Sequence, residues 1–132
     1  MPPDFFFFLS ESLQEIRSNE PDVDRAIELS LGSLRARLVT EGVSFVVSRV
    51  SGGWQIEQTC AQADVHLVFD KGIILDLIGG AATLNQAILD ERLSMFGSVD
   101  KIARFYDVLL IYVEGLLRAP GTPALLGRYL EV

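Results

Sequence analysis

The sequence predicts an α+β fold, with helices toward both ends of the chain and a mostly antiparallel sheet built from its middle. Apolar residues recur at helical spacing in the first 40 residues and again over 99–118. Between these segments, residues 43–69 are rich in β-branched and aromatic types and end in an apolar–polar alternation. Short strands that follow one another through tight turns favour antiparallel pairing. Together these observations predict helices packed on a sheet.

The size and composition of the chain fit one globular domain. Its 132 residues can bury one hydrophobic core, so we expect a single domain over 1–132, with a helical extension over 1–22 and a tail or short helix over 119–132. Apolar residues make up 49% and charged residues 22%, as in globular rather than disordered proteins. A mean hydropathy of +0.32 indicates more apolar surface than a core alone needs.

The charge and cysteine content exclude several classes of protein. Eleven basic and 18 acidic residues give a net charge of −7, which disfavours nucleic acid as a partner. The acids concentrate in residues 1–28, as a solvated face or as a surface for a basic partner. Cys60 is the only cysteine, which rules out an internal disulfide and suggests a reducing, cytoplasmic location. The run Phe5–Leu9 is too short for a signal peptide, and no segment approaches the ~20 apolar residues of a membrane span.

Two helices are expected in the first third of the chain. The first covers 4–18, with Asp4 as a possible N-cap, and Glu20-Pro21-Asp22 breaks it. The second covers 22–40 and ends at Gly42. Its apolar residues at helical spacing are Val23, Ile27, Leu31, Leu34 and Leu38.

Strands are expected next, because the apolar period changes. A strand over 43–50 is followed by the turn sequence Ser51-Gly52-Gly53 and by a return strand over 54–59. A further strand over 63–69 alternates, with Val65, Leu67 and Phe69 on one face. The three strands predict an antiparallel meander.

The remaining elements are predicted from caps and breakers. Asp70 can cap a short helix that Gly79-Gly80 closes, and Thr83 with Gln86 forms a capping box. Pro120, Gly121 and Pro123 stop the long helix. The elements expected here are helices over 73–78 and 84–90, a strand over 92–96, a helix over 99–118 and a last turn or two over 124–130.

The helix over 99–118 is apolar on nearly all sides. Between Phe105 and Leu117 its only charged residues are Asp107 and Glu114. A surface helix leaves about half of its circumference polar, so this helix must be covered on more than one side. It can belong to the core, to the wall of a cavity or to a subunit interface.

Four segments follow one another in the chain: Ala63-Asp64-Val65-His66-Leu67-Val68-Phe69, Ile73-Ile74-Leu75-Asp76-Leu77-Ile78-Gly79-Gly80, Gln86-Ala87-Ile88 and Leu93-Ser94-Met95-Phe96-Gly97. Together they resemble the sterol-carrier-protein-2 family. Members of that family show an Ala-Asp-Val strand, a short Leu-rich helix ending in glycine, a helix containing alanine and a Gly-x-Leu-x-apolar-x-Gly strand. The similarity covers residues 25–115, with a tryptophan strand before the series.

This resemblance implies a fold and a set of functions. The implied fold is a five-stranded, mostly antiparallel sheet, covered by helices on one face, with an apolar tunnel between the layers. Members look like carriers of fatty acids, sterols or acyl-CoA, and related domains serve as accessory modules in quinone biosynthesis or as appendages of larger enzymes. The chain departs from the pattern where Glu91-Arg92 replaces the usual glycine before a strand, and the N-terminal phenylalanines lie outside the shared region.

The sequence offers little for catalysis or metal binding. One histidine and one cysteine do not make a zinc site, and no acids are spaced like a calcium loop, so we expect no metal, no cofactor and no catalytic residue. His66 could join Asp64 and Ser44 or Ser48 in a triad, but no nucleophile elbow is present and a surface histidine is the simpler interpretation.

Other polar groups leave alternatives open. Residues 79–83 can be two helix caps or can receive an anion on free backbone N–H groups. On the apolar helix, Tyr106, Asp107, Tyr112 and Glu114 could orient a ligand, act as acid or base, or be paired with neighbours.

The main hypothesis is that the chain shelters a hydrophobic, lipid-like small molecule. An empty apolar space of about 300 Å³ would cost on the order of 7 kcal/mol, so it must collapse, take in water or hold a ligand. The alternatives are a non-catalytic accessory or scaffold module, as a homodimer or with an enzyme partner, and a cofactor-free cyclase or isomerase using Tyr106, Asp107 or His66. The residues expected to line the pocket are Phe45, Val47, Leu67, Phe69, Ile74, Leu77, Ile88, Met95, Ile102, Phe105, Tyr106, Leu109 and Val113.

Overall fold

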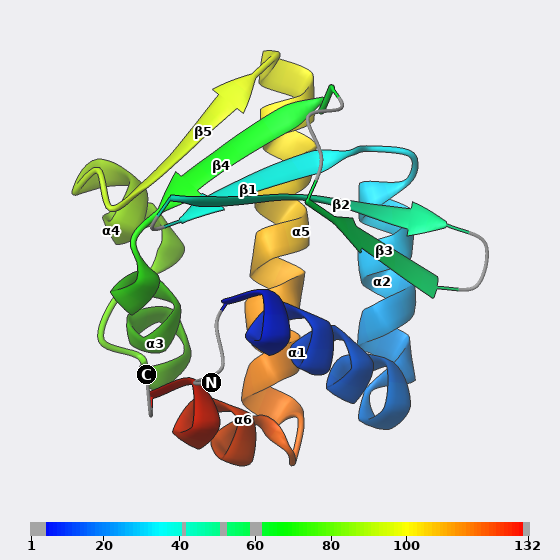
Figure 1. The fold of residues 1–132 in the computed structure, drawn as a ribbon, viewed down its shortest axis with the longest axis vertical. Coiled ribbons are helices and arrows are strands. Elements are labelled where there is room, and N and C mark those ends of the chain that lie inside the picture. Colours follow the sequence, from blue (N-terminus) through cyan, green and yellow to red (C-terminus); the bar gives the residue numbers. More distant parts are fainter. Residues whose placement is uncertain (1–4, 41, 51–52, 59–61, 131–132) are drawn as a thin grey trace.

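The structure, a computed structural model, describes residues 5–40, 42–50, 53–58 and 62–130 (Figure 1). The expected N-cap at Asp4, most of the turn Ser51-Gly52-Gly53 and the cysteine at position 60 lie outside these residues. The elements in chain order are α1 (Phe5–Asn19), α2 (Pro21–Leu31), β1 (Ala36–Thr40), β2 (Val43–Val50), β3 (Gly53–Glu57), β4 (Val65–Phe69), α3 (Lys71–Gly79), α4 (Leu84–Leu89), β5 (Leu93–Gly97), α5 (Val99–Arg118) and α6 (Thr122–Leu130).

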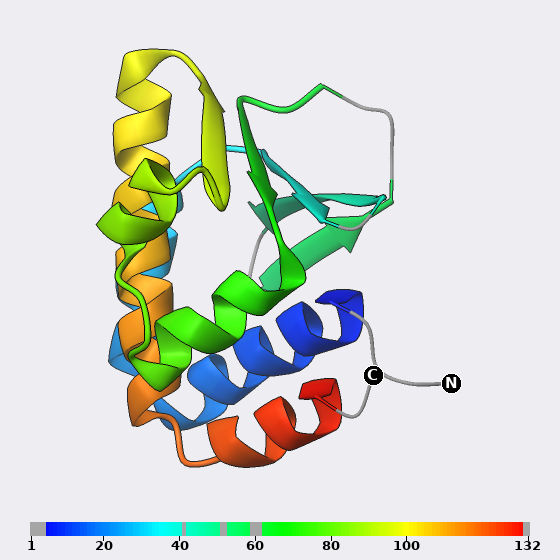
Figure 2. The same ribbon diagram turned by 90° about the vertical axis from the view of Figure 1, so that its left-hand side faces the viewer.

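The five strands form one sheet in the order β3-β2-β1-β4-β5. Three of the four pairings are antiparallel, and β1 pairs with β4 in parallel. The helices lie on one face of this sheet, with α2 and α5 side by side and α1 crossing beneath the strands (Figures 1 and 2). The predicted α+β class and the five-stranded, mostly antiparallel sheet are confirmed.

The expected meander is wrong in one pairing. Strand β4 does not continue from β3 but crosses to the other side of β1, where Leu38 stands opposite Leu67. Strand β4 therefore lies inside the sheet, with β1 on one side and β5 on the other. Its alternating apolar residues face the helices.

The helix expected over 22–40 is also wrong, because its second half is a strand. Helix α2 ends at Leu31, and Gly32 follows with a φ of 56°, which an L side chain rarely adopts. After it, Leu34, Ala36 and Leu38 are buried alternately, as in a half-buried strand. The spacing 31, 34, 38 satisfies a helical period, but the spacing 34, 36, 38 satisfies a strand equally well.

The predicted caps are confirmed at atomic detail. The Asp70 carboxylate accepts a hydrogen bond of 2.8 Å from the backbone N–H of Ile73 at the start of α3. Thr83 and Gln86 form the reciprocal capping box at the start of α4. Pro123, expected as a helix stop, instead stands in the first turn of α6, where its missing N–H costs no hydrogen bond.

The turn that leads into β5 contains one residue in the left-handed backbone conformation. Glu91 has a φ of 60° and is the one residue other than glycine with positive φ in the described part of the chain. It occupies the place where the sequence resemblance expects a glycine. The backbone conformation is therefore retained although the glycine is not.

The core lies between the sheet and the helices and includes α1. Phe8 and Ile16 of this helix have no exposed surface, and the rings of Phe5 and Phe69 are 5.0 Å apart in an edge-on arrangement. The N-terminal helix thus belongs to the main core. Helix α5 buries one side against α2 and the sheet and leaves Leu110 and Leu117 exposed.

Candidate functional site

An apolar cavity of about 70 Å³ lies between the inner face of the sheet and the helices. Apolar atoms alone face it, and its walls come from α1, α2, α3, α4, α5 and all five strands. Eight of the thirteen residues expected from the sequence line this cavity: Val47, Leu67, Phe69, Ile74, Leu77, Phe105, Leu109 and Val113.

The other five expected residues lie beside the cavity, outside its lining. Phe45 is fully buried and packs on the rings of Phe5 and Phe6 at 6.4 and 5.3 Å between centroids. Tyr106 donates a hydrogen bond of 2.6 Å to the side-chain oxygen of Asn85. The remaining three are partly buried at the edge of the core: Ile88, Met95 and Ile102.

The most important lining residues that the sequence analysis missed are on α1. Phe5, Leu9 and Leu13 face the cavity at positions four residues apart, which is the spacing of one helix face. This spacing is visible in the sequence, but nothing local indicates that the face turns toward the sheet. Further lining residues that were not expected are Ile27, Leu31, Ala36, Leu38, Trp54, Ile78, Leu84, Leu93, Val108, Tyr112 and Leu116.

The cavity is much smaller than the space of about 300 Å³ that the sequence analysis supposed. Phe5, Leu9 and Leu13 of α1 are among the side chains that surround it. At about 24 cal/mol per Å³, leaving 70 Å³ empty costs about 2 kcal/mol, which a folded domain tolerates. An empty cavity of this size therefore does not by itself require a ligand.

A buried hydrogen bond joins α1 to α5 at the bottom of the cavity. The hydroxyls of Ser12 and Tyr112 are 2.5 Å apart, and Ser12 also donates to the carbonyl oxygen of Leu9 at 2.9 Å. Tyr112 thus contributes an apolar ring to the cavity wall while its hydroxyl is turned to α1. The side chains of Asp107 and Glu114 on this helix are exposed.

The indole of Trp54 is held in place by polar groups at the edge of the cavity. Its N–H donates to Asp24 at 3.3 Å, and the guanidinium of Arg49 lies 4.9 Å from the ring centroid. Arg49 makes two hydrogen bonds to Asp24, at 2.9 and 3.2 Å, and these raise the pKa of the guanidinium despite its burial. The ring is consequently fixed between α2 and the strands.

The triad considered from the sequence is not assembled. His66 lies on the outer face of the sheet, because its neighbours in the strand, Val65 and Leu67, are buried on the inner face. The carboxylate of Asp64 accepts a 2.9 Å hydrogen bond from the backbone N–H of Arg35, which is the main reason that its pKa is lowered, with a smaller contribution from Lys101. The polar groups proposed for acid–base chemistry therefore do not converge on the cavity.

The segment 79–83 is built as two helix caps. The backbone N–H of Ala82 bonds to the carbonyl of Asp76, and that of Thr83 bonds to the side chain of Gln86. These donors are engaged within the turn. Within the described part of the chain, no group of three His, Cys, Asp or Glu residues is placed to hold a metal ion.

No helix among the described residues has the length and apolar composition needed to cross a membrane.

Comparison with known proteins identifies the fold. No protein-family model matches the sequence, and no curated protein matches it either. Among solved structures, the chain is similar to a sterol carrier protein 2 domain from Helicoverpa armigera, with a TM-score of 0.60 and 15% identity over 82% of this chain and 87% of that one. It is similar to a UbiJ-SCP2 ubiquinone synthesis protein, with a TM-score of 0.58 and 13% identity over 77% and 90% of the two chains. A crystal structure of sterol carrier protein 2 matches with a TM-score of 0.57 and 13% identity over 85% and 95%.

Proposed function

Because the chain has the fold of sterol carrier protein 2 domains, we propose that it binds and carries a hydrophobic, lipid-like small molecule between its sheet and its helices. The observation that supports this proposal is the cavity, which only apolar atoms face and to which five helices and every strand contribute. Lining of this kind favours an alkyl, sterol, isoprenoid or polyketide chain over a polar ligand. A cytoplasmic location belongs to the same proposal.

Binding requires the cavity to widen, because 70 Å³ is too small for a lipid-like ligand, and we infer that α1 is the element that moves. A chain of about 14 methylenes contributes about 11 kcal/mol of transfer free energy. Exposing Phe5, Leu9 and Leu13 to water would cost about 1.5–3 kcal/mol each and would cancel roughly 40–80% of that gain. We therefore infer that α1 shifts outward and keeps its apolar face on the ligand. This preserves a binding free energy of about −8 kcal/mol, which corresponds to a micromolar dissociation constant.

The proposal is tested by looking for the ligand and by enlarging the cavity. Native mass spectrometry of the purified protein should show co-purified lipid, and delipidated protein should bind a fluorescent fatty acid. Leu9→Ala should raise that affinity several-fold, because the smaller side chain leaves more room for the ligand, whereas Leu29→Ala on the exposed side of α2 should leave it unchanged. Absence of both co-purified lipid and fatty-acid binding would contradict the proposal.

A second function is supported by the outer face of the sheet. Val68 and Phe96, on the neighbouring strands β4 and β5, are 41% and 56% exposed on the face that no helix covers (Figure 1). Such a face suits an accessory module that joins an enzyme partner or a second copy, and one similar structure is a ubiquinone synthesis protein. Phe96→Ser should abolish association in light scattering or pull-down experiments while leaving lipid binding intact. A wild-type protein that is monomeric and retains no partner would exclude this second function.

A further inference from the structure

The outer side of α5 carries an uncharged stripe with a seven-residue repeat. Its members follow one another at alternating intervals of four and three residues, which is the a/d spacing by which one helix packs on another. At about 1.5 Å per residue, the stripe is about 27 Å long. We call it the α5 seam, and its residues are Val99, Ala103, Tyr106, Leu110, Val113 and Leu117.

The rest of the protein leaves the α5 seam open. Val99, Leu110 and Leu117 are 83%, 39% and 59% exposed, and the other members are exposed or half-buried. Figure 2 shows α5 running along one side of the molecule, with the sheet and α1 on its inner side. The helix already buries that inner side in the core, so packing within this chain does not account for a second apolar stripe. An exposed apolar surface of this kind indicates a site of contact with another protein.

A line of acids borders the α5 seam on the solvent side. They recur at the same interval of seven residues, in the e position of the heptad, and are Asp100, Asp107 and Glu114. All three are exposed, and none of them makes an ion pair with a described residue. The bases near the start of the helix are engaged elsewhere, Lys101 in an ion pair and Arg104 on the last carbonyl groups of α2. Arg118 stands at the last position of the helix. The flank of the seam is therefore negative along most of its length.

We propose that the α5 seam binds an amphipathic helix of another protein whose apolar stripe is flanked by lysine or arginine residues. Charges beside a helix–helix seam pair across the two helices and select the partner. A second copy of this chain does not fit, because two antiparallel copies would set the line of acids against itself. The acids, together with the net charge of −7, also repel an anionic lipid surface.

The α5 seam is separate from both surfaces considered above. Val68 and Phe96 lie on the outer face of the sheet, whereas α5 packs against the inner face. Leu109 lines the cavity, but its neighbour Leu110, at the centre of the seam, does not. A helix bound to the seam therefore leaves the outer face of the sheet free, and the inference does not depend on lipid binding.

The test uses the full chain and two synthetic helical peptides of three heptads each. Both peptides have leucine at the a and d positions. The basic peptide has lysine at the e and g positions, and the acidic peptide has glutamate there, so like charges keep each peptide from pairing with itself. Isothermal titration calorimetry should show that wild type binds the basic peptide at least about tenfold more tightly than the acidic one, with an affinity that falls as salt is added.

Two variants locate the binding site. Leu110→Gln should weaken binding of the basic peptide about tenfold, because the central apolar contact of the seam is lost. Leu29→Gln, at an exposed leucine of α2, is the matched control and should bind as wild type does. The double variant Asp107→Lys and Glu114→Lys should reverse the preference and bind the acidic peptide more tightly. Glutamine and lysine are both good helix formers, so α5 is retained.

Each alternative outcome contradicts the proposal. No binding of either peptide, equal affinity for both, or a preference that the double variant leaves unchanged would overturn the choice of a basic partner. Equal binding by Leu110→Gln and wild type would show that the seam is not the site. A dimer in light scattering, or binding to phosphatidylglycerol vesicles, that Leu110→Gln abolishes would assign the seam to a different occupant. None of these results affects the carrier function, because Leu110→Gln should bind a fluorescent fatty acid as wild type does.

Discussion

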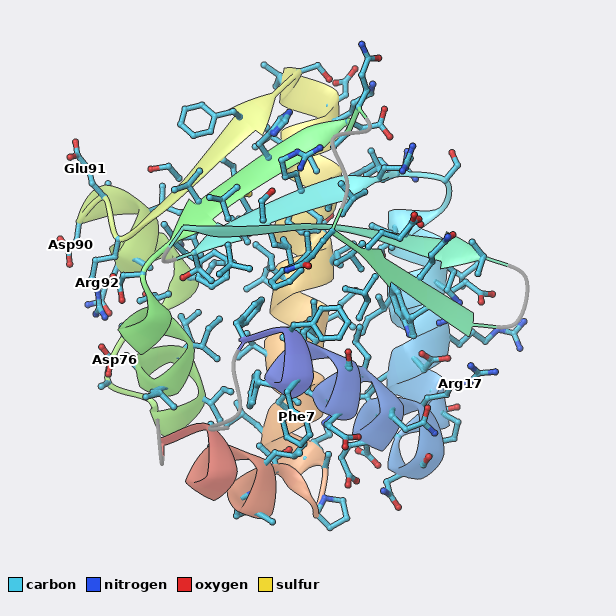
Figure 3. The ribbon with its side chains drawn as sticks, viewed as in Figure 1. Phe7, Arg17, Asp76, Asp90, Glu91 and Arg92 are labelled. Atoms are coloured by element: carbon cyan, nitrogen blue, oxygen red, sulfur yellow. The ribbon has the colours of Figure 1, made fainter. Side chains whose placement is uncertain are left out.

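At the scale of single residues, the turn from α4 into β5 depends on one strained backbone conformation. Glu91 has a φ of 60°, and its N–H still bonds to the carbonyl of Ile88 at 3.1 Å. The next residue, Arg92, holds the turn through ion pairs to Asp70 at 3.0 Å and to Asp76 at 2.7 Å. Figure 3 shows Glu91, Arg92 and Asp76 on the same side of the molecule. These partly exposed contacts hold a conformation that an L side chain disfavours by about 1–2 kcal/mol.

Replacing Glu91 by glycine should therefore stabilise the protein. Glycine adopts positive φ without steric cost but loses more entropy on folding, so we expect a net gain of about 0.5–1 kcal/mol in the free energy of unfolding in urea. Asp90→Gly is the matched control and should destabilise, because Asp90 has a φ of −85°. A lower free energy of unfolding in Glu91→Gly would show that the backbone at residue 91 is not strained.

The sequence predicted the position of a side chain correctly where the periodicity of a single strand or helix determines which face it occupies. Alternation along β4 correctly placed Leu67 and Phe69 on the inner face. It could not place Phe5, because that side chain reaches the cavity only through the packing of α1 beneath the sheet. The sequence shows that Glu91 stands where the resemblance expects a glycine. It does not show that the backbone there keeps its left-handed conformation.

At the scale of elements, three helices meet at one glycine. Gly115 of α5 is buried, and a Cβ on it would lie 2.6 Å from Val23 of α2 and 3.3 Å from Ile16 of α1. The close approach of α5 to both helices thus depends on the missing side chain. It also positions Tyr112, one turn earlier, to reach Ser12.

Gly115→Ala should lower the free energy of unfolding by about 1–3 kcal/mol, because a methyl group must be forced into a filled core. The measurement is thermal or urea unfolding. Gly127→Ala in α6 is the matched control, since nothing lies within 4 Å of its Cβ position, and it should be neutral or stabilising. Equal behaviour of the two variants would contradict the packing described here.

The same scale explains which elements the sequence could predict. The long helix was assigned to 99–118 and α5 has those bounds, because Pro120 follows an unbroken helical period. The strand β1 was missed because Leu34 and Leu38 fit both periods and because its partners, β2 and β4, lie later in the chain.

At the scale of the whole molecule, two carboxylates make the free energy of unfolding depend on pH in the acid range, because tertiary contacts lower their pKa values. The pKa of Asp70 is lowered chiefly by its hydrogen bonds from Arg92, and that of Asp64 chiefly by the backbone N–H of Arg35. Each joins segments distant in sequence. Since both folded-state pKa values are depressed, their stabilisation is fully present above the unfolded value of about 3.9 and is lost as the pH falls through the folded values.

We therefore expect the free energy of unfolding to be nearly constant above about pH 5 and to fall below about pH 4. Urea unfolding between pH 2.5 and pH 7 gives this profile. Asp70→Asn should be less stable than wild type at neutral pH and show a shallower loss in acid. A profile that Asp70→Asn and Asp64→Asn both leave unchanged would contradict this assignment.

The central claim at this scale is that a ligand enters the cavity as α1 shifts outward. Hydrogen–deuterium exchange of the full chain, with and without saturating tetradecanoic acid, tests it most directly. We predict that exchange slows in β1, β4 and α5, which line the cavity, and becomes faster in the N-terminal half of α1, around Phe5 and Leu9. Unchanged or slower exchange throughout α1 would contradict the account, because the ligand would then be bound elsewhere.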